Sequence, residues 1–222
     1  RLLVCSDGYL YNGKRHDCRK KIEAAISRIP SIETCIVVPY SNTSLDIKGM
    51  KKCELVDSFC VPRNGTSTTF QQLPFSHPLY ILYSSGTTGR PKCIVHSAGG
   101  ALLTHVKEHQ LHCDINPGDK VFYFTTCGWM MWNWLVSVLA CEARIVLYDG
   151  SPFYPSKKIL FDIIDKENIT FFGTGAKYID TLRNEKINIK FSNKLTKLKT
   201  IASTGSPLSQ ESFKYIYKNI KN

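Results

Sequence analysis

Apolar residues follow two different spacings along the first forty positions, and the change of spacing marks the predicted elements. Residues 1–11 alternate as in a strand that turns at Asp7-Gly8. Residues 17–29 place apolar side chains three and four positions apart, as in a helix, and stop before Pro30. Residues 34–38 are rich in β-branched side chains and predict a second strand. The N-terminal segment is therefore predicted to be β-α-β.

After a polar stretch, strand and helix patterns alternate to the end of the chain. Residues 41–73 contain Gly, Pro, Asn and Thr throughout, with one short strand candidate at 54–56, and predict a surface insertion. Further strand patterns cover residues 79–83, 93–96, 121–125, 144–148, 170–172 and 198–203, and helical patterns begin near residues 98, 131, 156, 176 and 209. This alternation predicts an α/β fold of mostly parallel sheets covered by helices. We expect two parts, residues 1–74 and residues 75–222.

The chain is basic, with 29 Lys and Arg against 18 Asp and Glu and a formal net charge of +11. Such a charge fits nucleic-acid binding. However, the lysines of the second half are scattered among apolar residues, as on solvated helix faces, and no zinc-finger, basic-zipper or RNA-recognition pattern accompanies them. We therefore expect no nucleic-acid partner and interpret the charge as a solvated surface that attracts polyanionic small molecules.

The cysteines indicate a reducing compartment. There are nine, an odd number, and none forms a C-x-x-C pair. This pattern is typical of free thiols in the cytosol rather than of a disulfide framework. The sequence also has no signal-peptide pattern and no apolar run long enough to cross a bilayer. We therefore predict a cytoplasmic protein without a membrane partner.

A segment rich in Ser, Thr and Gly follows the predicted strand 79–83 and reads Tyr83-Ser84-Ser85-Gly86-Thr87-Thr88-Gly89-Arg90-Pro91-Lys92. Glycine lets backbone N–H groups approach an anion without a Cβ in the way, hydroxyl groups add donors, and a lysine adds positive charge. The segment is not a Walker loop, because its glycines are three residues apart and Lys92 is followed by Cys93. It is either an ordinary hairpin turn or another kind of phosphate loop.

His105-Val106-Lys107-Glu108-His109 fits H-x-x-E-H, an inverted zinc-protease pattern. A zinc enzyme needs a further ligand, and the sequence offers no obvious third ligand motif. We therefore predict no metal site here and expect a solvent-facing helix of mixed charge.

The extended string Y-S-S-G-T-T-G-x-P-K resembles the phosphate-binding signature of the adenylate-forming superfamily, which includes acyl-CoA synthetases, luciferases and the adenylation domains of peptide synthetases. The stretch from Phe75 to about Pro152 is similar to the acetoacetyl-CoA synthetases within that superfamily, notably at Gly128-Trp129-Met130-Met131-Trp132-Asn133-Trp134. The similarity is looser before Phe75, and after Pro152 it returns clearly at Gly205-Ser206-Pro207.

The resemblance implies an acid–thiol ligase with residues 75–222 as its AMP- and ATP-binding core. Such an enzyme uses ATP and Mg²⁺ to convert acetoacetate to an acyl-adenylate and pyrophosphate, and CoA then takes the acyl group. Acetate or another short acid is an alternative substrate. A catalytically inactive nucleotide-binding module is the alternative to an enzyme.

The resemblance also implies roles for individual residues. The ATP phosphates would be held by Ser84, Ser85, Gly86, Thr87, Thr88 and Gly89. The catalytic residue would be Lys92, which offsets charge on the pyrophosphate leaving group. The acyl pocket would be lined by Trp129, Met130 and Met131, although such side chains also fill cores. The adenosine would be contacted by Gly205, Ser206 and Pro207, where Ser206 replaces the family's common Glu.

Two further expectations come from the same resemblance. Lys14 and Arg15 would face the 3′-phosphate of CoA, or else form a solvated turn. The sequence begins without Met and stops directly after a helical pattern. We expect it to be part of a large N-terminal domain, without the family's small C-terminal domain and its lysine for adenylate formation. These 222 residues are therefore expected to turn over slowly or not at all on their own.

Overall fold

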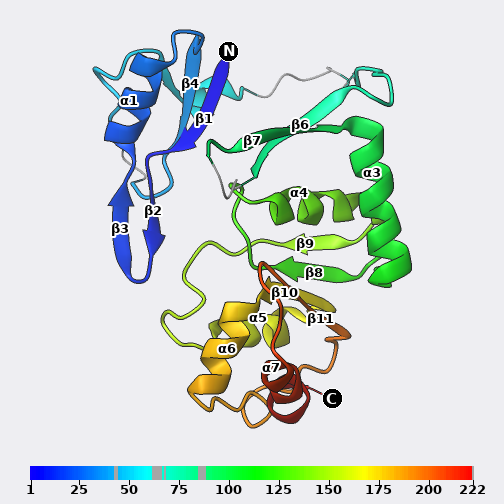
Figure 1. The fold of residues 1–222 in the computed structure, drawn as a ribbon. Coiled ribbons are helices and arrows are strands. Elements are labelled where there is room, and N and C mark those ends of the chain that lie inside the picture. The colour runs from blue at the N-terminus through cyan, green and yellow to red at the C-terminus, as the bar shows by residue number, and fades with distance from the viewer. Residues whose placement is uncertain (43–44, 62–66, 68, 85–88, 222) are drawn as a thin grey trace. The chain divides into compact units, whose positions relative to one another are not determined.

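The computed structural model describes residues 1–42, 45–61, 67, 69–84 and 89–221 of the chain. It divides into two compact units (Figure 1). Unit 1 consists of Arg1–Phe70 together with Asp149–Pro155, and unit 2 consists of Gln71–Tyr148 and Ser156–Asn222. The predicted division after residue 74 stays a prediction about the domains of the whole protein.

Unit 1 contains the predicted β-α-β segment. Its sheet has the order β1-β4-β5 with all strands parallel. The bounds of its elements are β1 Leu2–Ser6, β2 Gly8–Tyr11, β3 Lys14–Asp17, α1 Arg19–Arg28, β4 Thr34–Val38, β5 Cys53–Leu55 and α2 Val56–Phe59. Ile22 of α1 packs with Cys35, Val37 and Leu45 in the core of this unit. β2 and β3 form a separate antiparallel hairpin.

Unit 2 is built on a second parallel sheet, with the order β11-β10-β8-β9. Its strands are β8 Lys120–Tyr123, β9 Arg144–Val146, β10 Phe171–Gly175 and β11 Thr200–Thr204. The helical segments that follow the strands are α4 Met130–Ser137 with η2 Val138–Cys141, α5 Ile159–Glu167, α6 Ala176–Asn184 and α7 Gln210–Tyr215 with η3 Ile216–Ile220. Parallel strands need such crossover connections.

The two faces of this sheet are both covered. Val121 and Tyr123 of β8 pack in one cluster with Trp134 and Leu135 of α4. Phe122 points to the opposite face, where its ring packs against Phe172 of β10. Phe172 in turn packs against Phe161 of α5. Alternation of side chains along a strand explains this division. The structure confirms the predicted α/β class of parallel sheets covered by helices.

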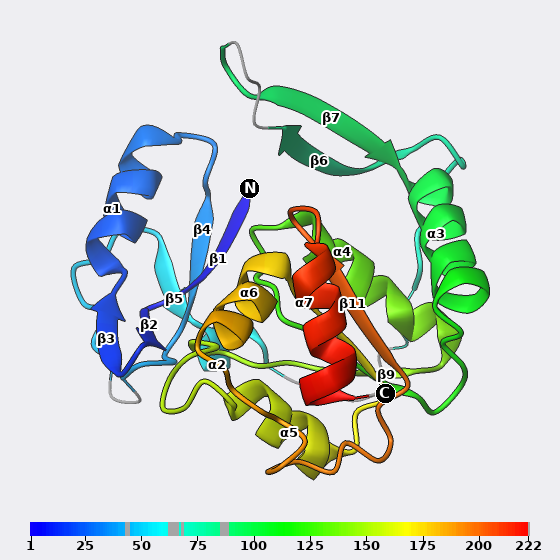
Figure 2. The same cartoon turned by 60° about the horizontal axis from the view of Figure 1, so that its bottom comes forward.

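An antiparallel hairpin precedes the sheet of unit 2. It consists of β6 Pro78–Ser84 and β7 Lys92–Ser97. Figure 1 and Figure 2 both show β7 leading into α3, Ala98–Lys107, which continues as the π-helical η1, Glu108–His112. Ser97 caps α3, because its Oγ accepts from Gly100 N at 3.3 Å. Within the described residues, no helix combines the length and apolar character needed to cross a membrane.

Candidate functional site

Ser84 and Lys92, near the two ends of the predicted phosphate loop, lie opposite each other in the β6–β7 hairpin. Directly opposed residues of an antiparallel pair share one face. Lys92 is exposed and has no ion-pair or hydrogen-bond partner among the residues that the structure describes. Ser85, Gly86, Thr87 and Thr88 lie outside the described residues, and Gly89 is exposed. The hairpin therefore presents, at the start of β7, an ammonium group that no described residue pairs with.

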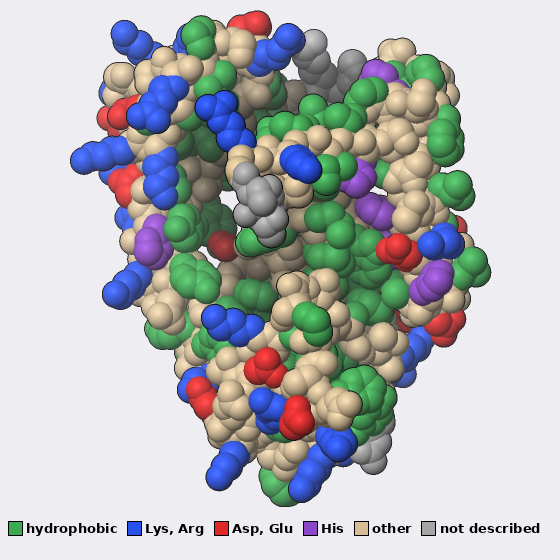
Figure 3. Space-filling view, in the orientation of Figure 1, with side chains coloured by type: hydrophobic (Ala, Val, Ile, Leu, Met, Phe, Trp, Pro, Cys, Tyr) green, Lys and Arg blue, Asp and Glu red, His purple; other side chains and the backbone are tan. Residues whose placement is uncertain are grey.

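A pocket of about 480 Å³ is lined by residues of the hairpin, α3, η1 and α4. The apolar part of its wall comes from Tyr80, Leu82, Val95, Met130 and Trp134. The polar part comes from His96, Ser97, Thr104, His105, Glu108 and Asn133. In Figure 3, histidine side chains lie among hydrophobic ones over the part of unit 2 that contains α3. An apolar wall with a few polar groups is the usual composition of a small-molecule site.

The hairpin wall of this pocket continues to the phosphate loop. Leu82 lines the pocket, and Ser84 is two residues further along the same strand. Residues two apart on a strand lie on one face, about 7 Å from each other. Because Ser84 pairs with Lys92, the lysine lies on that same face. A molecule in the pocket and an anion at the loop would therefore be neighbours.

The three residues predicted for the acyl pocket have three different surroundings. Met130, the first residue of α4, lines the pocket. Met131 packs against the core cluster under α4. Trp129 precedes the helix as its N-cap residue and is 71% exposed. The helical turn of 100° per residue separates their directions. The role of all three residues in binding an acid stays a prediction.

The H-x-x-E-H residues make a hydrogen-bond network with α4. Glu108 Oε2 accepts from Trp134 Nε1 at 3.0 Å. Ser137 Oγ lies 3.0 Å from His105 Nδ1, 2.9 Å from His109 Nε2 and 2.7 Å from the Trp134 carbonyl oxygen. A carbonyl oxygen only accepts, so the single hydroxyl proton goes to Trp134 and both imidazoles donate to Ser137. His105 is thereby left with an acceptor, not a donor, at Nε2.

Burial sets the protonation of this network. Burial, reinforced by the neighbouring His105, lowers the pKa of His109 to about 4, and burial also lowers the pKa of His105. The prediction of a solvent-facing helix is wrong for His109, which is fully buried. The reason is that the ring of His109 packs edge-on against Trp134, with 4.3 Å between centroids. Among the described residues, no three His, Cys, Asp or Glu side chains are placed to hold a metal ion.

The loop Gly205-Ser206-Pro207 follows β11 and is exposed. Gly205 has φ +91°, a conformation that glycine adopts without strain. β8, β10 and β11 are parallel, so this loop and the one that leads to Trp129 leave the same edge of the sheet. Ligands of open α/β sheets bind at this carboxyl edge. Ser209 then caps α7 by accepting from Ser212 N at 3.2 Å.

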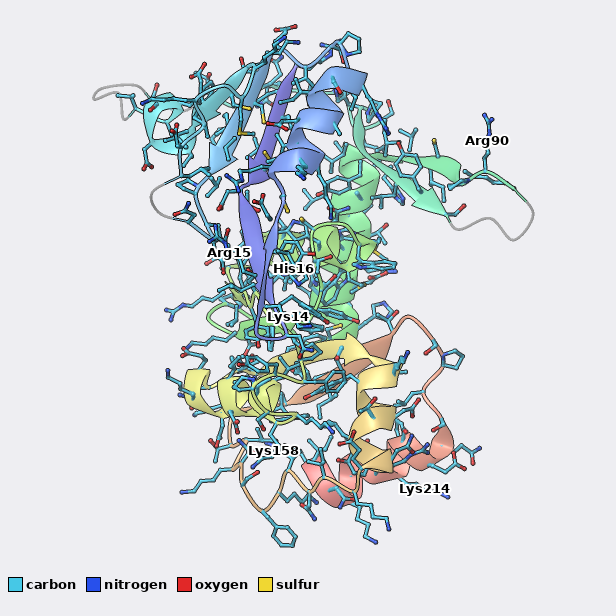
Figure 4. All side chains as sticks on the ribbon, turned by 90° about the vertical axis from the view of Figure 1, so that its left-hand side faces the viewer. Lys14, Arg15, His16, Arg90, Lys158 and Lys214 are labelled. Atoms are coloured by element: carbon cyan, nitrogen blue, oxygen red, sulfur yellow. The ribbon has the colours of Figure 1, made fainter. Side chains whose placement is uncertain are left out.

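Lys14 and Arg15 lie on the β2–β3 hairpin of unit 1, with His16 beside them (Figure 4). Lys14 is exposed. Arg15 Nε donates to Ser41 Oγ at 3.2 Å, and a terminal nitrogen of Arg15 lies 3.8 Å from the buried carboxylate of Asp7. Arg15 therefore also has a structural role, which the sequence pattern did not indicate.

Comparison with known proteins places this chain in a family. The model of the family described as AMP-binding enzyme matches residues 2–220. The chain belongs to this AMP-binding enzyme family. It is 45% identical to the acetoacetyl-CoA synthetase of Gallus gallus and 47% identical to the acetoacetyl-coenzyme A synthetase of Rhizobium meliloti (strain 1021), in each case over 100% of this chain and 34% of the relative.

A solved structure has the same fold over this chain. The acetoacetyl-CoA synthetase from Streptomyces lividans matches with a TM-score of 0.89 and 38% identity, over 98% of this chain and 33% of that chain. The resemblance to acetoacetyl-CoA synthetases that the sequence motifs indicated is thereby confirmed. The chain spans about a third of the length of these relatives.

Sequence reasoning missed several residues that the structure brings to the pocket of unit 2. Asn133 is the clearest, since it lines the pocket three residues after Met130. Residues three apart on a helix lie on one face, so this spacing could have identified it. Tyr80 and Leu82 line the pocket through the pairing of β6 with β7, which local sequence spacing does not reveal.

Proposed function

We propose that the protein carrying this chain activates acetoacetate with ATP and transfers it to CoA. The observation that supports this most directly is the continuous hairpin face from the pocket to Ser84 and Lys92. The acid would occupy the pocket and its carboxylate would face the nucleotide phosphates. Holding two reactants in contact in this way removes much of the entropic barrier to their reaction.

In the first step an oxygen of the substrate carboxylate attacks the α-phosphorus of ATP. The bond from that phosphorus to the pyrophosphate oxygen breaks, which gives acyl-adenylate and pyrophosphate. Residues 84–89 would hold the β- and γ-phosphates, and Lys92 would offset the charge that grows on the pyrophosphate. In the second step the CoA sulfur attacks the acyl carbon, AMP leaves, and the thiol proton is released. No nucleophile from the protein is required.

The remaining predicted residues fit the same reaction as binding groups. Gly205, Ser206 and Pro207 would contact the adenosine at the carboxyl edge of the sheet. Trp129, Met130 and Met131 would border the acid. Lys14 and Arg15 would attract the 3′-phosphate of CoA. Mg²⁺ would arrive with the nucleotide as Mg-ATP. The cytoplasmic location stays a prediction.

Pyrophosphate release by the full-length protein tests this function. The protein is given Mg-ATP with acetoacetate, acetate, butyrate or no acid. We expect release that depends on acetoacetate and that falls by about 10²- to 10³-fold in Lys92→Ala, the range seen when one charge-stabilising donor is removed. Lys214→Ala removes an equally exposed lysine of α7 and should leave the rate unchanged.

Each other result has a defined meaning. Release with acetate or butyrate instead of acetoacetate would keep the adenylation chemistry and change the acid. No release with any acid, from a protein that still binds ATP, would favour a catalytically inactive nucleotide-binding module.

A further inference from the structure

The amide of Asn133 is an unpaired polar group in the wall of the pocket. Asn133 is half-buried on α4 and lines the pocket together with Met130, one helical turn earlier. No other described residue forms a hydrogen bond with its side chain. An amide offers two N–H donors and an acceptor. A half-buried amide without a partner is available to a ligand.

Two neighbouring polar groups of the wall, Glu108 and His105, are already occupied or have the wrong polarity for a carbonyl ligand. Glu108 is an acceptor that takes the indole N–H of Trp134. His105 donates from Nδ1 to Ser137 and presents only an acceptor at Nε2. Ser97 Oγ caps α3. The other lining donors are Thr104, which is exposed, and His96 of β7.

The size of the pocket cannot select a four-carbon acid. A volume of about 480 Å³ falls within the range of sites that bind drug-sized molecules. Acetoacetate and butyrate have similar lengths and differ by the oxygen on carbon 3. A site that hydrogen-bonds this oxygen discriminates against butyrate, because butyrate would leave the donor in the pocket without a partner.

We propose that Asn133 determines acid specificity by donating a hydrogen bond from Nδ2 to the 3-oxo oxygen of a 3-oxo acid in this pocket. The inference rests on the proposed function, since it assumes that the pocket holds the acid that is adenylated. Met130 would pack against the carbon chain of the acid. Asn133, three residues further along α4, would donate to its 3-oxo oxygen.

The test is the ratio of kcat/KM for acetoacetate to kcat/KM for butyrate, measured by pyrophosphate release from the full-length protein. Asn133→Leu removes the donor at similar volume. We expect it to lower kcat/KM for acetoacetate about tenfold, the value of one neutral hydrogen bond. The kcat/KM for butyrate should stay the same or rise, because no donor is then left unpaired, and the KM for ATP should not change. Asn133→Ala repeats the test if the Leu variant fails to fold. Thr104→Val tests the other donor of the wall. Gln110→Leu is the matched control, because it replaces an exposed amide of η1 outside the pocket and should keep the wild-type ratio.

The outcomes separate this inference from the function on which it rests. Equal losses for both acids in Asn133→Leu would indicate a structural role and overturn the inference. A changed ratio in Thr104→Val with an unchanged ratio in Asn133→Leu would overturn it as well. A wild-type protein that releases no pyrophosphate with any acid would overturn the proposed function, and this inference with it.

Discussion

His109 Nε2 donates a hydrogen bond to Ser137 Oγ at 2.9 Å, inside unit 2. The Ser137 hydroxyl donates its only proton to the Trp134 carbonyl, so it can only accept from His109. His109 therefore carries its proton on Nε2. Nδ1 of His109 is then an acceptor, and it is buried without a partner among the described residues. A proton on Nδ1 would place a charge in this buried position, which explains why the pKa of His109 is lowered to about 4.

Replacing His109 should make stability less dependent on pH. Below pH 6.5 the unfolded chain binds a proton at this histidine, whereas the folded chain does not until about pH 4. Stability contributed by neutral His109 is therefore complete above pH 6.5 and is lost as the pH falls toward 4, by at most about 1.4 kcal/mol per pH unit. When the pH falls from 7.5 to 4.5, the free energy of unfolding of His109→Gln should therefore decrease by about 2 kcal/mol less than that of the wild type.

Urea unfolding at several pH values measures this difference. Carboxylates and His105 titrate in both proteins, so subtracting the two curves isolates His109. Curves that stay parallel from pH 7.5 to pH 4.5 would contradict the buried neutral histidine.

Asp7 anchors the start of the polar stretch of unit 1. Its Oδ1 accepts from Tyr40 N at 2.7 Å and from Ser41 N at 2.8 Å, and its Oδ2 accepts from Ser41 Oγ at 2.6 Å. Burial alone raises the pKa of Asp7, but the bonds from Ser41 and Tyr40 and the charge of Arg15 outweigh it and hold the pKa below its usual value. This stabilisation is present above the unfolded pKa of 3.8 and is lost as the pH falls through the lowered folded value.

Asp7→Ala should destabilise unit 1 by about 2–4 kcal/mol at neutral pH, because the backbone N–H groups of Tyr40 and Ser41 lose their acceptor. Asp7→Asn should cost less, since its amide oxygen can keep both backbone bonds. Denaturant unfolding gives the stabilities, and faster amide exchange at Tyr40 and Ser41 should accompany the loss. Asp46→Ala is the control, because exposed Asp46 accepts from Lys48 N alone among the residues that the structure describes. Equal effects at Asp7 and Asp46 would contradict the anchoring role.

The elements with a strong apolar period were predictable from the sequence. β4, Thr34–Val38, matches its predicted bounds, and α6, Ala176–Asn184, begins at the predicted residue. Both carry a strong signal because β4 buries a continuous apolar run and α6 buries one apolar face. β3 was missed, since its residues are all polar and exposed. The signal that would have found it is the turn Asn12-Gly13, where φ is 51° and 74°, as a two-residue hairpin of type I′ requires.

The sequence could suggest candidate site residues only where they are contiguous in the chain. The phosphate-loop candidates follow one strand, so a motif could suggest them, and their role stays a prediction. The pocket depends on β6 pairing with β7 and on α3 and α4 lying against it, which no local spacing encodes. The burial of His109 was missed for the same reason, because its partners Trp134 and Ser137 are 25 or more positions away.

Gly173 of β10 lies directly opposite Tyr123 of β8, and the ring of Tyr123 occupies the space where a side chain at 173 would begin. A Cβ added to Gly173 would lie 2.0 Å from Tyr123 Cδ2. Tyr123 is itself buried, at 5% exposure, between Trp134 and the sheet, so its ring has little room to move. The core of unit 2 therefore requires glycine at this position.

Gly173→Ala should destabilise unit 2 by about 1–3 kcal/mol, the usual cost of overpacking a core, and thermal unfolding measures it. Gly175→Ala, on the same strand, is the control: its Cβ would lie 3.8 Å from the nearest atom outside its chain neighbours, so the cost should be smaller. In a Tyr123→Leu background the cost of Gly173→Ala should shrink, because the obstructing ring is gone and the two positions are coupled. A cost that is the same in both backgrounds would mean that strain in β10 itself, and not the ring of Tyr123, excludes a side chain at 173.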